Sequence, residues 1–550
     1  MNSVSRPILY LLLAALAFAW FSPLGERNLT RPDEGRYAEI AREMVVSGDW
    51  LTPRLNGYKY FEKPVLQYWA TAASFSLFGL ADWSARLWPA LTGFLGIVLV
   101  FLGGNQLFRP PAGLFAAAAL AGSAIYVMMG HMLTLDMGVS FFLSASVLAV
   151  AIAQLDTSTP DRRRNWMLAA WGLAALAVLS KGLIGIVLPA GAVALYVLLQ
   201  RDWRLLTRLE LAAGGALFLA ITAPWFVQVS RANPEFLRFF FVYEHFERFL
   251  TEAHGRYQPL WYFVPVLLVG LLPWTISLFP AIVNGWHSGG RARFRPARFL
   301  LLWAAVVFAF FSISSSKLPS YILPMFPALA LLIGRYLAQA GRRAAGMCIA
   351  QALAAAALGI AGAAWSPNAL RFAQASLPAE LLARYVPWLA GAAISLFAGS
   401  VLAAAFWWRA KPVWGALALG AGGLAFAQLA ITGHGELSPV YSAYHIVERA
   451  RPNLKPDAPF YVVNTFDHTL PYYLGRTVTM VGYKDELATS IGWEPERFLP
   501  DVAAFTRSWQ AEGEAFAVFA ARDFENFRKS AGISMQVIAA DPRRVLVKKP

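Results

Sequence analysis

A dense group of ionisable residues follows the first hydrophobic segment of the chain. The stretch 31–68 has the sequence RPDEGRYAEIAREMVVSGDWLTPRLNGYKYFEKPVLQY and is unusually polar for this apolar chain. Asp33 and Glu34 stand side by side in it, and Glu62 is followed directly by Lys63. Carboxylates can bind a cation or orient a hydroxyl group, and a neighbouring lysine can neutralise a phosphate. We therefore expect the chemistry of the protein to be centred on this stretch.

The first part of the stretch has the periodicity of a surface helix. Apolar residues recur at positions 37, 40, 41, 44 and 45, which places them on one helical face. Asp33 occupies the expected N-cap position, and the glycine-containing run 47–49 is expected to end the helix. A cap needs only one carboxylate, so it does not account for Glu34 or for Arg36 close behind.

Composition predicts the class of protein. Of the 550 residues, 58% are hydrophobic and 14% are charged, and a soluble protein of this length cannot bury so much apolar surface. The net charge of +15 would suit nucleic acid, but the arginines fall in short clusters between hydrophobic segments, as in membrane proteins. The single cysteine, Cys348, excludes an intrachain disulfide framework and a zinc–thiolate site. The sequence therefore predicts a polytopic α-helical membrane protein.

Hydropathy indicates fourteen candidate spans, and the charge pattern selects among them. They lie at about 7–24, 64–80, 84–106, 111–130, 136–155, 166–180, 182–200, 209–229, 259–285, 298–314, 319–340, 345–365, 387–408 and 413–432. All arginine clusters fall on the cytoplasmic side only if segment 64–80 does not cross the membrane. Gln67, Tyr68 and Trp69 near its start suit an interfacial or re-entrant helix. We predict thirteen spans, with the first segment retained rather than cleaved and the C-terminus outside.

The sequence from about residue 433 onward has ordinary polar content. Strands are predicted at 459–465, 477–483, 515–521 and 535–540, and helices at 498–511 and 523–530. We therefore predict two domains. Residues 1–432 form the membrane domain, in which 25–83 is the first outer loop with its juxtamembrane helices, and residues 433–550 form an outer α/β domain.

Other loops on the predicted outer face also carry ionisable or aromatic polar residues. These are Asp136 in TLDMG, Lys181 in LSKG, His245 and Arg248 in the loop 230–258, and Lys317 and Tyr321 in SSSKLPSYILP. An ionisable residue at the end of a span is costly to place there, so it is a functional candidate. A lone lysine could instead extend to lipid headgroups. Lysines recur on the predicted face that has no arginine clusters, and this recurrence argues against that explanation.

These residue types suit an anionic lipid substrate at the membrane surface. Four basic residues are predicted to converge on a phosphate: Lys63, Lys181, Arg248 and Lys317. The carboxylates of Asp33, Glu62 and Asp136 would lie beside them. Such a site describes a transferase with a lipid-phosphate donor rather than an ion channel. The chain has no Walker A, G-x-G-x-x-G or H-E-x-x-H motif, so nothing supports a nucleotide cofactor or a zincin centre.

The stretch 31–70, together with TLDMG, LSKG and SSSKLPSYILP, resembles the bacterial lipid A aminoarabinose transferases. These are inner-membrane glycosyltransferases of the GT-C superfamily, similar in fold to the protein O-mannosyltransferases. The resemblance implies about thirteen membrane helices with juxtamembrane helices, and a C-terminal periplasmic α/β domain. It also implies transfer of 4-amino-4-deoxy-L-arabinose, with inversion, from undecaprenyl phosphate to a lipid A phosphate at the periplasmic face, which gives resistance to polymyxin and other cationic antimicrobial peptides.

The resemblance further implies residue roles. Asp33 matches the catalytic acidic position, and Asp136 and Lys63 are the other expected catalytic residues. The expected substrate-binding residues are Arg36, Tyr37, Tyr60, Lys181, Arg248, Lys317 and Tyr321. A phosphate acceptor, with a second pKa of roughly 6, is largely ionised at neutral pH. Asp33 is therefore expected to hold the sugar ammonium or orient the acceptor rather than to act as an obligatory base.

A divalent metal is an open question at the sequence level. Glu62 and His245 are candidate ligands, with Glu244 or Asp136 as helpers, and many members of the superfamily use such an ion. His245 could equally form a hydrogen bond within a polar loop. The basic residues can neutralise a leaving phosphate by themselves, so the chemistry does not require a metal.

Three other functions compete with this interpretation. A mannosyltransferase-like enzyme of the same superfamily would use a polyprenyl-linked donor with a hydroxyl acceptor, and it would need a base. A transporter or lipid flippase would have inverted repeats and charges near the bilayer midplane, and the sequence has no such repeat. A receptor-like anchor for the C-terminal domain would leave the charged loops unexplained. Membrane lipids are expected partners under every reading, and nucleic acid is not.

Overall fold

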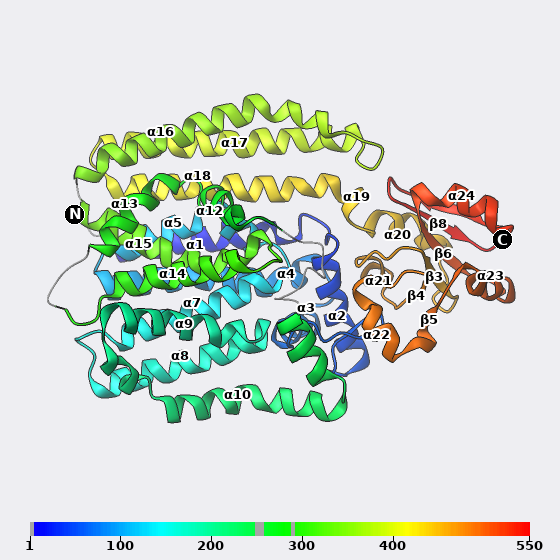
Figure 1. The fold of residues 1–550 in the computed structure, drawn as a ribbon. Coiled ribbons are helices and arrows are strands. Elements are labelled where there is room, and N and C mark those ends of the chain that lie inside the picture. The colour runs from blue at the N-terminus through cyan, green and yellow to red at the C-terminus, as the bar shows by residue number, and fades with distance from the viewer. Residues whose placement is uncertain (1–4, 248–257, 288–291, 341) are drawn as a thin grey trace.

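The computed structural model describes residues 5–247, 258–287, 292–340 and 342–550. A bundle of long helices forms the larger part of the molecule, and a smaller α/β domain stands at one end of it (Figure 1). The N-terminus lies at the opposite end of the bundle, and the C-terminus lies in the α/β domain. The two ends of the bundle therefore differ in what they carry.

The predicted hydrophobic segments form helices, but the predicted spans 111–130 and 259–285 are each broken into two short helices, bent by 68° and 109°. The bundle contains α1 (Arg6–Phe21), α4 (Asp82–Phe108), α5 (Ala112–Ala121), α6 (Ala124–Gly130), α7 (Leu135–Ala153), α8 (Pro160–Lys181), α9 (Ile184–Gln200), α10 (Leu211–Ala232), α12 (Phe263–Gly270), α13 (Thr275–Trp286), α14 (Pro296–Ile313), α15 (Phe326–Ala340), α16 (Arg342–Trp365), α17 (Ala379–Trp408) and α18 (Pro412–Gly433). Among the described residues, 9 helices are long and apolar enough to cross a membrane, or up to 11 if the bent pairs α5–α6 and α12–α13 each form one span. Helices α8 and α9 cover the two remaining predicted segments. The chain is a multi-pass membrane protein.

The hydrophobic segment 64–80 forms helix α3 (Leu66–Phe78), which has 13 residues. At 1.5 Å per residue it is about 20 Å long, which is shorter than the roughly 30 Å of hydrocarbon that a span crosses. It contacts α4 and also α2 (Asp33–Ser47), the helix of the polar stretch. This length agrees with the prediction that the segment does not cross the membrane.

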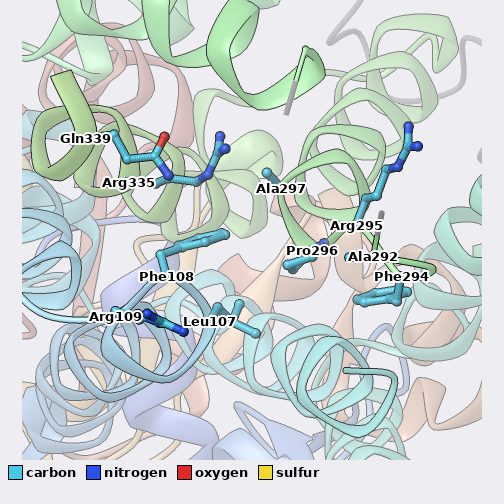
Figure 2. Close-up of a pocket in the computed structure, with 10 residues that line it drawn as sticks. All are labelled: Leu107, Phe108, Arg109, Ala292, Phe294, Arg295, Pro296, Ala297, Arg335 and Gln339. Atoms are coloured by element: carbon cyan, nitrogen blue, oxygen red, sulfur yellow. The ribbon is translucent and has the colours of Figure 1, made fainter. Parts of the chain in front are cut away.

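The end of α4, the start of α14 and the end of α15 lie at the end of the bundle remote from the α/β domain (Figure 1). Arg109, Arg295 and Arg335 line one pocket between α4, α14 and α15 (Figure 2). Arg293 Nη2 lies 2.8 Å from Asp202 Oδ1, so the cluster before α14 also reaches the segment that follows α9. This gathering agrees with the predicted alternation of basic loops and loops of mixed charge.

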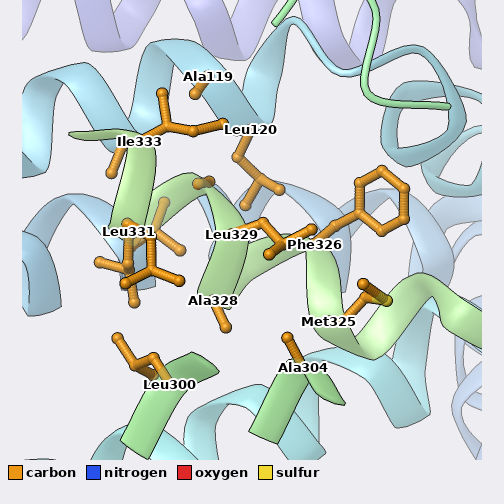
Figure 3. Close-up of a cluster of buried hydrophobic side chains, with 14 of the residues drawn as sticks. Ala119, Leu120, Leu300, Ala304, Met325, Phe326, Ala328, Leu329, Leu331 and Ile333 are labelled. Atoms are coloured by element: carbon orange, nitrogen blue, oxygen red, sulfur yellow. The ribbon is translucent and has the colours of Figure 1, made fainter. Parts of the chain in front are cut away.

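Helix α15 forms part of the centre of the core. Its residues from Phe326 to Ile333 are all buried, because a helix with apolar residues on every face is covered by neighbours on every side. Figure 3 shows these side chains beside Leu120 of α5 and Leu300 of α14. The helix continues directly from the 3-10 helix η5 (Pro319–Met325). Core packing therefore fixes the position of Tyr321 in η5.

The polar stretch folds into α2 and a short hairpin. Helix α2 ends at Gly48, which has the left-handed conformation (φ 72°) expected of such a C-cap. Strands β1 (Arg54–Leu55) and β2 (Tyr58–Lys59) pair across Asn56 and Gly57, both with positive φ, as a tight hairpin turn requires. The expected N-cap role of Asp33 is wrong. Pro32 occupies that position, and Asp33 is the first residue of the helix.

The C-terminal region contains one six-stranded sheet. Its strands are β3 (Phe460–Val463), β4 (Thr479–Val481), β5 (Phe498–Leu499), β6 (Phe516–Ala520), β7 (Gln536–Ala540) and β8 (Arg544–Lys548), in the order β5-β4-β3-β6-β8-β7. Strands β5, β4, β3 and β6 run parallel to one another, and β8 is antiparallel to both β6 and β7. The four predicted strands are confirmed, while β5 and β8 were not predicted.

Helices surround this sheet. They are α19 (Ser438–Tyr441), α20 (Tyr444–Ala450), α21 (Leu470–Leu474), α22 (Ala488–Trp493), α23 (Val502–Ala511) and α24 (Ala521–Ala531). The predicted helices at 498–511 and 523–530 correspond to α23 and α24, although the first two residues of the former belong to β5. Helix α21 contacts α2, so the sheet is docked against the polar stretch.

Candidate active site

A cavity of about 470 Å³ lies where the bundle meets the α/β domain. Eight of the predicted site residues line it: Asp33, Arg36, Tyr37, Glu62, Lys63, Asp136, Lys181 and Tyr321. They are carried by α2, by the loop before α3, by the start of α7, by the end of α8 and by η5. Loops that are far apart in the sequence thus form one cavity.

Arg36 connects the two parts of the molecule at this cavity. Its Nη1 donates to Asp33 Oδ1 at 2.8 Å, while its Nε and Nη2 lie 2.9 and 2.6 Å from the two carboxylate oxygens of Glu486. The Arg36 side chain is 6% exposed, whereas that of Asp33 is 37% exposed. A planar guanidinium that holds a carboxylate by two bonds fixes its orientation as well as its charge. Asp33 is therefore held in place beside a rigid cation and still faces the cavity.

Glu486 and its neighbours in the α/β domain are site residues that the sequence analysis missed. His468 Nε2 lies 2.8 Å from Glu486 Oε1. Burial opposes ionisation of Glu486, but the hydrogen bond from His468 and the charge of Arg36 lower its pKa to about 2. His468, Asp485 and Glu486 all line the cavity. The α/β domain thus supplies one wall of the site, with a carboxylate that stays ionised at neutral pH.

A sequence signal for this wall exists. Asp485 and Glu486 follow strand β4 closely, in the run YKDEL, and His468 follows β3. Parallel strands place their carboxyl ends at one edge of a sheet, where ligand sites commonly form. Polar residues just after predicted parallel strands could therefore have been taken as site candidates.

Another part of the wall joins Asp136, Lys181 and Tyr321. Asp136 near the start of α7 and Lys181 at the end of α8 form an ion pair. The Lys181 ammonium also lies 4.7 Å from the centre of the Tyr321 ring, within the range of a cation–π contact. Lys181 is therefore directed into the cavity wall rather than toward lipid headgroups.

Glu62 and Lys63 reach the cavity from the loop between β2 and α3. Lys63 Nζ donates to the Glu62 carbonyl oxygen at 2.7 Å, and both residues line the cavity. Tyr37 is buried beside Tyr68, with ring centres 6.0 Å apart. Tyr60 is 2% exposed and lies behind the lining, where burial raises its pKa well above the usual value. Tyr60 thus supports the wall rather than facing the cavity.

The structure does not bring every predicted residue to the cavity. Lys317 is buried, and its ammonium donates to the carbonyl oxygens of Ser314 and Gln258 at 2.6 and 2.8 Å. It satisfies backbone groups near the end of α14 and is not among the cavity-lining residues, so its predicted convergence with Lys63 is not found. Arg248 lies outside the described residues, and so does the side chain of His245.

The predicted metal site cannot be assembled from the described side chains. In the ranges that the structure describes, no group of three or more His, Cys, Asp or Glu side chains is arranged to hold a metal ion. Glu62 lines the cavity, but the side chain of His245, its predicted partner, is outside the part of the chain that the structure describes. A metal bound by Glu62 and His245 therefore stays a prediction.

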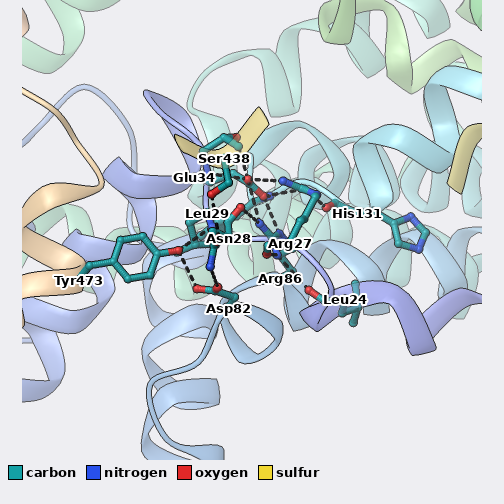
Figure 4. Close-up of polar contacts among 12 residues, drawn as sticks. Leu24, Arg27, Asn28, Leu29, Glu34, Asp82, Arg86, His131, Ser438 and Tyr473 are labelled. Carbon is teal, nitrogen blue, oxygen red and sulfur yellow. Dashed lines mark hydrogen bonds and ion pairs between the residues drawn. The ribbon is translucent and has the colours of Figure 1, made fainter. Parts of the chain in front are cut away.

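Glu34, the neighbour of Asp33, points into a different environment. Its carboxylate is 1% exposed and lies between Arg27 and Arg86, at 2.6 and 2.7 Å (Figure 4). The backbone N–H of Thr30 and that of Leu133 also donate to it, at 3.0 and 3.1 Å. Burial opposes ionisation, but the two guanidinium groups hold the pKa of Glu34 well below its usual range. This Glu34 cluster, comprising Glu34, Arg27 and Arg86, is closed and fully bonded.

The cavity by contrast has the chemistry to bind a charged sugar and a phosphate together. Lys63 and Lys181 supply positive charge for an anion. The exposed carboxylate of Asp33 can pair with an ammonium group or accept a hydrogen bond from a hydroxyl group. A site of this kind at the end of a membrane bundle suits a lipid-linked sugar substrate.

Comparison with known proteins decides the family. Residues 446–549 match the family model described as "Aminoarabinose transferase C-terminal domain", and residues 62–227 match "Dolichyl-phosphate-mannose-protein mannosyltransferase". The crystal structure of ArnT from Cupriavidus metallidurans bound to undecaprenyl phosphate is 37% identical in sequence, with a TM-score of 0.93, over 99% of this chain and 98% of that chain. This chain belongs to the ArnT family. The resemblance noted in the sequence is therefore confirmed, and so is the GT-C fold.

Other relatives agree with membership of the ArnT family. An undecaprenyl phosphate-alpha-4-amino-4-deoxy-L-arabinose arabinosyl transferase of Pseudomonas aeruginosa (strain UCBPP-PA14) is 36% identical over 335 residues. That match spans 60% of this chain and 59% of the curated relative. An oligosaccharyltransferase from Archaeoglobus fulgidus has a TM-score of 0.51 at 13% identity, so its likeness to this chain concerns the fold alone.

Proposed function

We propose that this chain transfers 4-amino-4-deoxy-L-arabinose from undecaprenyl phosphate to a phosphate of lipid A. The observation that carries the proposal is the single cavity in which Asp33, Lys63 and Lys181 meet at the end of the bundle. It is supported by the near full-length likeness to an ArnT that binds undecaprenyl phosphate. The name of the P. aeruginosa relative supports the same sugar and the same carrier. The lipid A acceptor rests on the family resemblance.

The proposed reaction exchanges one glycosyl bond for another. The bond between the anomeric carbon and the oxygen of undecaprenyl phosphate breaks, and the carrier phosphate leaves with the electron pair. A phosphate oxygen of lipid A attacks the opposite face of the same carbon, so the configuration is inverted. An acceptor phosphate with a second pKa of roughly 6 is already largely ionised at neutral pH, so no side chain has to remove a proton.

The residues of the cavity have separable proposed roles. Lys63 and Lys181 balance the charge that develops on the leaving phosphate, an electrostatic contribution that can amount to several kcal/mol. Arg248, although outside the described residues, stays a proposed helper. Asp33, fixed by Arg36 and partly exposed, holds the sugar ammonium or orients the acceptor. Asp136 holds Lys181 through their ion pair.

The site is proposed to face the periplasm from the inner membrane. The arginine clusters lie at the opposite end of the bundle, and the positive-inside rule assigns that end to the cytoplasm. Both lipid substrates then reach the cavity from the outer leaflet. The added amine offsets phosphate charge on lipid A, which lowers its attraction for polymyxin and similar cationic peptides.

Mass spectrometry of lipid A tests the proposal. A polymyxin-sensitive strain that makes the donor but lacks its own transferase would express the wild-type chain or Asp33→Asn at matched membrane levels. We expect the mass increase of the aminosugar with the wild-type chain and its loss with Asp33→Asn. No increase with either chain would overturn the proposal and favour a mannosyltransferase-like enzyme with another acceptor, which the match over residues 62–227 supports as the second candidate.

A further inference from the structure

A second cavity, of about 310 Å³, adjoins the active-site cavity. Arg31 and Asp467 line this second cavity, while the residues that follow each of them, Pro32 and His468, line the active-site cavity. The chain at these two places therefore forms a shared wall. Ser376, from the segment before α17, also lines the second cavity. It is thus lined from both the α/β domain and the membrane bundle.

The second cavity lies at the point where the sheet reverses its direction of winding. The chain proceeds from β3 to β4 and β5 on one side, and then returns to place β6 on the other side of β3. Thr465 just after β3 and Ala520 at the end of β6 both line the cavity. In sheets of this kind, ligands bind outside the carboxyl ends of the strands at such a switch point.

The charge of the second cavity is strongly positive. Its charged lining residues are Arg31, Arg522, Arg543, Arg544 and Asp467. The Asp467 carboxylate is bound by Arg544 Nη1 at 2.7 Å, so these two charges largely cancel. Three guanidinium groups are left, with no carboxylate among the described lining residues to balance them.

The protein itself satisfies these three arginines only in part. Arg31 Nε is buried and has no hydrogen-bond partner in the described structure. Burial, together with the nearby charge of Arg31, lowers the pKa of Arg543. The ion pair of Arg522 with Asp523 is highly exposed and therefore weak. Like charges placed together in a cavity are stabilised by a bound anion.

We propose that the second cavity binds a phosphate of the acceptor glycolipid while another phosphate of the same molecule lies in the active-site cavity. Guanidinium groups match phosphate oxygens in geometry and charge. The shared wall brings the two sites close enough for one headgroup that carries two phosphates. This inference rests on the proposed function, because it assigns the second subsite to the same acceptor.

The test compares acceptors that carry one or two phosphates. Full-length protein in phosphatidylcholine nanodiscs would be titrated with diphosphorylated and monophosphorylated lipid A, for the wild-type chain and for the double variant Arg522→Gln/Arg543→Gln. Arg528→Gln is the matched control, because Arg528 lies on the same helix α24, is exposed and is ion-paired with Glu525, but does not line the cavity. The backbone bonds at Arg543 do not involve its side chain, so the double variant retains them.

We expect the wild-type chain to bind the diphosphorylated acceptor about tenfold more tightly than the monophosphorylated one, as one additional charge-assisted contact provides. The double variant loses this preference, and Arg528→Gln keeps it. The single variant Arg522→Gln, whose side chain is 87% exposed so that its loss leaves the fold intact, reduces the preference. An unchanged preference in the double variant, or an equal loss for both acceptors, overturns the proposal.

Two further measurements distinguish a phosphate of the acceptor from that of an ordinary membrane lipid or from free inorganic phosphate. If phosphatidylglycerol in the nanodiscs abolishes the preference, the cavity binds ordinary lipid headgroups and the assignment to the acceptor is wrong. Inorganic phosphate at millimolar concentration is expected to compete only weakly. Sugar transfer is measured in the same samples. A wild-type chain that transfers no sugar refutes the proposed function, whereas the binding preference is measured without transfer.

Discussion

The Glu34 cluster and the active-site cavity lie on either side of the start of helix α2, and they use the same residue types in opposite ways. In the cluster, Glu34 is 1% exposed and receives bonds from Arg27, Arg86 and two backbone groups. In the cavity, Asp33 has one arginine partner and is 37% exposed. A carboxylate whose bonding capacity is filled by the protein stabilises the fold, and one that is held but incompletely bonded is available to a ligand.

The largest expected effect is on stability, at Glu34. Glu34→Gln leaves the guanidinium groups of Arg27 and Arg86 buried without a balancing charge, which is expected to cost about 3–5 kcal/mol of the free energy of unfolding. Thermal unfolding in detergent measures the change. Glu525→Gln, at an exposed ion pair of α24, is the control and is expected to have little effect. If Glu34→Gln unfolded at the same temperature as the wild type, the Glu34 cluster would not have the stabilising role assigned to it.

Glu486, which lines one wall of the cavity, is expected to stabilise the contact between the two domains in a pH-dependent way. Its pKa is about 2 in the folded chain, against 4.5 ordinarily, so its stabilising contribution is present above pH 4.5 and is lost as the pH falls toward 2. The difference corresponds to about 3 kcal/mol. Unfolding of the wild-type chain and Glu486→Gln would be compared between pH 7 and pH 3. A gap between the two chains that does not narrow in acid contradicts the prediction.

Asp33 is expected to affect the reaction and not the fold. Asp33→Asn removes the charge that is proposed to position the substrate, and a misplaced substrate can lower kcat/KM on the order of 100-fold. The partly exposed carboxylate contributes little to stability, so the unfolding temperature is expected to stay close to that of the wild type. Transfer kinetics with purified protein and a parallel unfolding curve measure both. Near-normal turnover would contradict the role assigned to Asp33.

The smallest expected effect on kcat/KM comes from a comparison of Lys63→Met with Lys317→Met. Lys63 lines the cavity, so Lys63→Met is expected to lower kcat/KM roughly tenfold or more through the loss of one charge-assisted contact to phosphate. The Lys317 ammonium is bonded to backbone carbonyl oxygens away from the cavity lining, so Lys317→Met is expected to change kcat/KM by less than about twofold. Equal losses from both substitutions would place Lys317 in the reaction after all.

The sequence predicts the bundle well because hydropathy and arginine clusters report directly on the bilayer. Segment 64–80 was assigned outside the set of spans on charge pattern, and α3 is indeed too short to cross. Strand β8 was missed because its sequence, RVLVK, is short and begins and ends with charged residues that interrupt an apolar run. Its Arg544 is nevertheless buried, because Asp467 and Asp541 bind it. Burial of this kind depends on tertiary partners that no local pattern displays.

The candidate site was predictable to the extent that its residues end membrane segments. Asp136, Lys181 and Tyr321 do so, and they line the cavity. Glu486 lies in a region of ordinary polarity, and only docking of the sheet against α2 brings it to Arg36. Lys317 has the same local pattern as Lys181, yet a nearby bend of the backbone supplies it with carbonyl partners.

The bond between Arg36 and Glu486 joins residues 450 positions apart, and this separation has a consequence for biogenesis. At roughly 5–20 residues per second, the ribosome needs on the order of a minute to pass from one residue to the other. During that time α2 is already made, but the cavity lacks its second wall. A nascent chain therefore lacks the Glu486 bonds that orient Arg36, and the site is completed only once the last domain has been made and has docked.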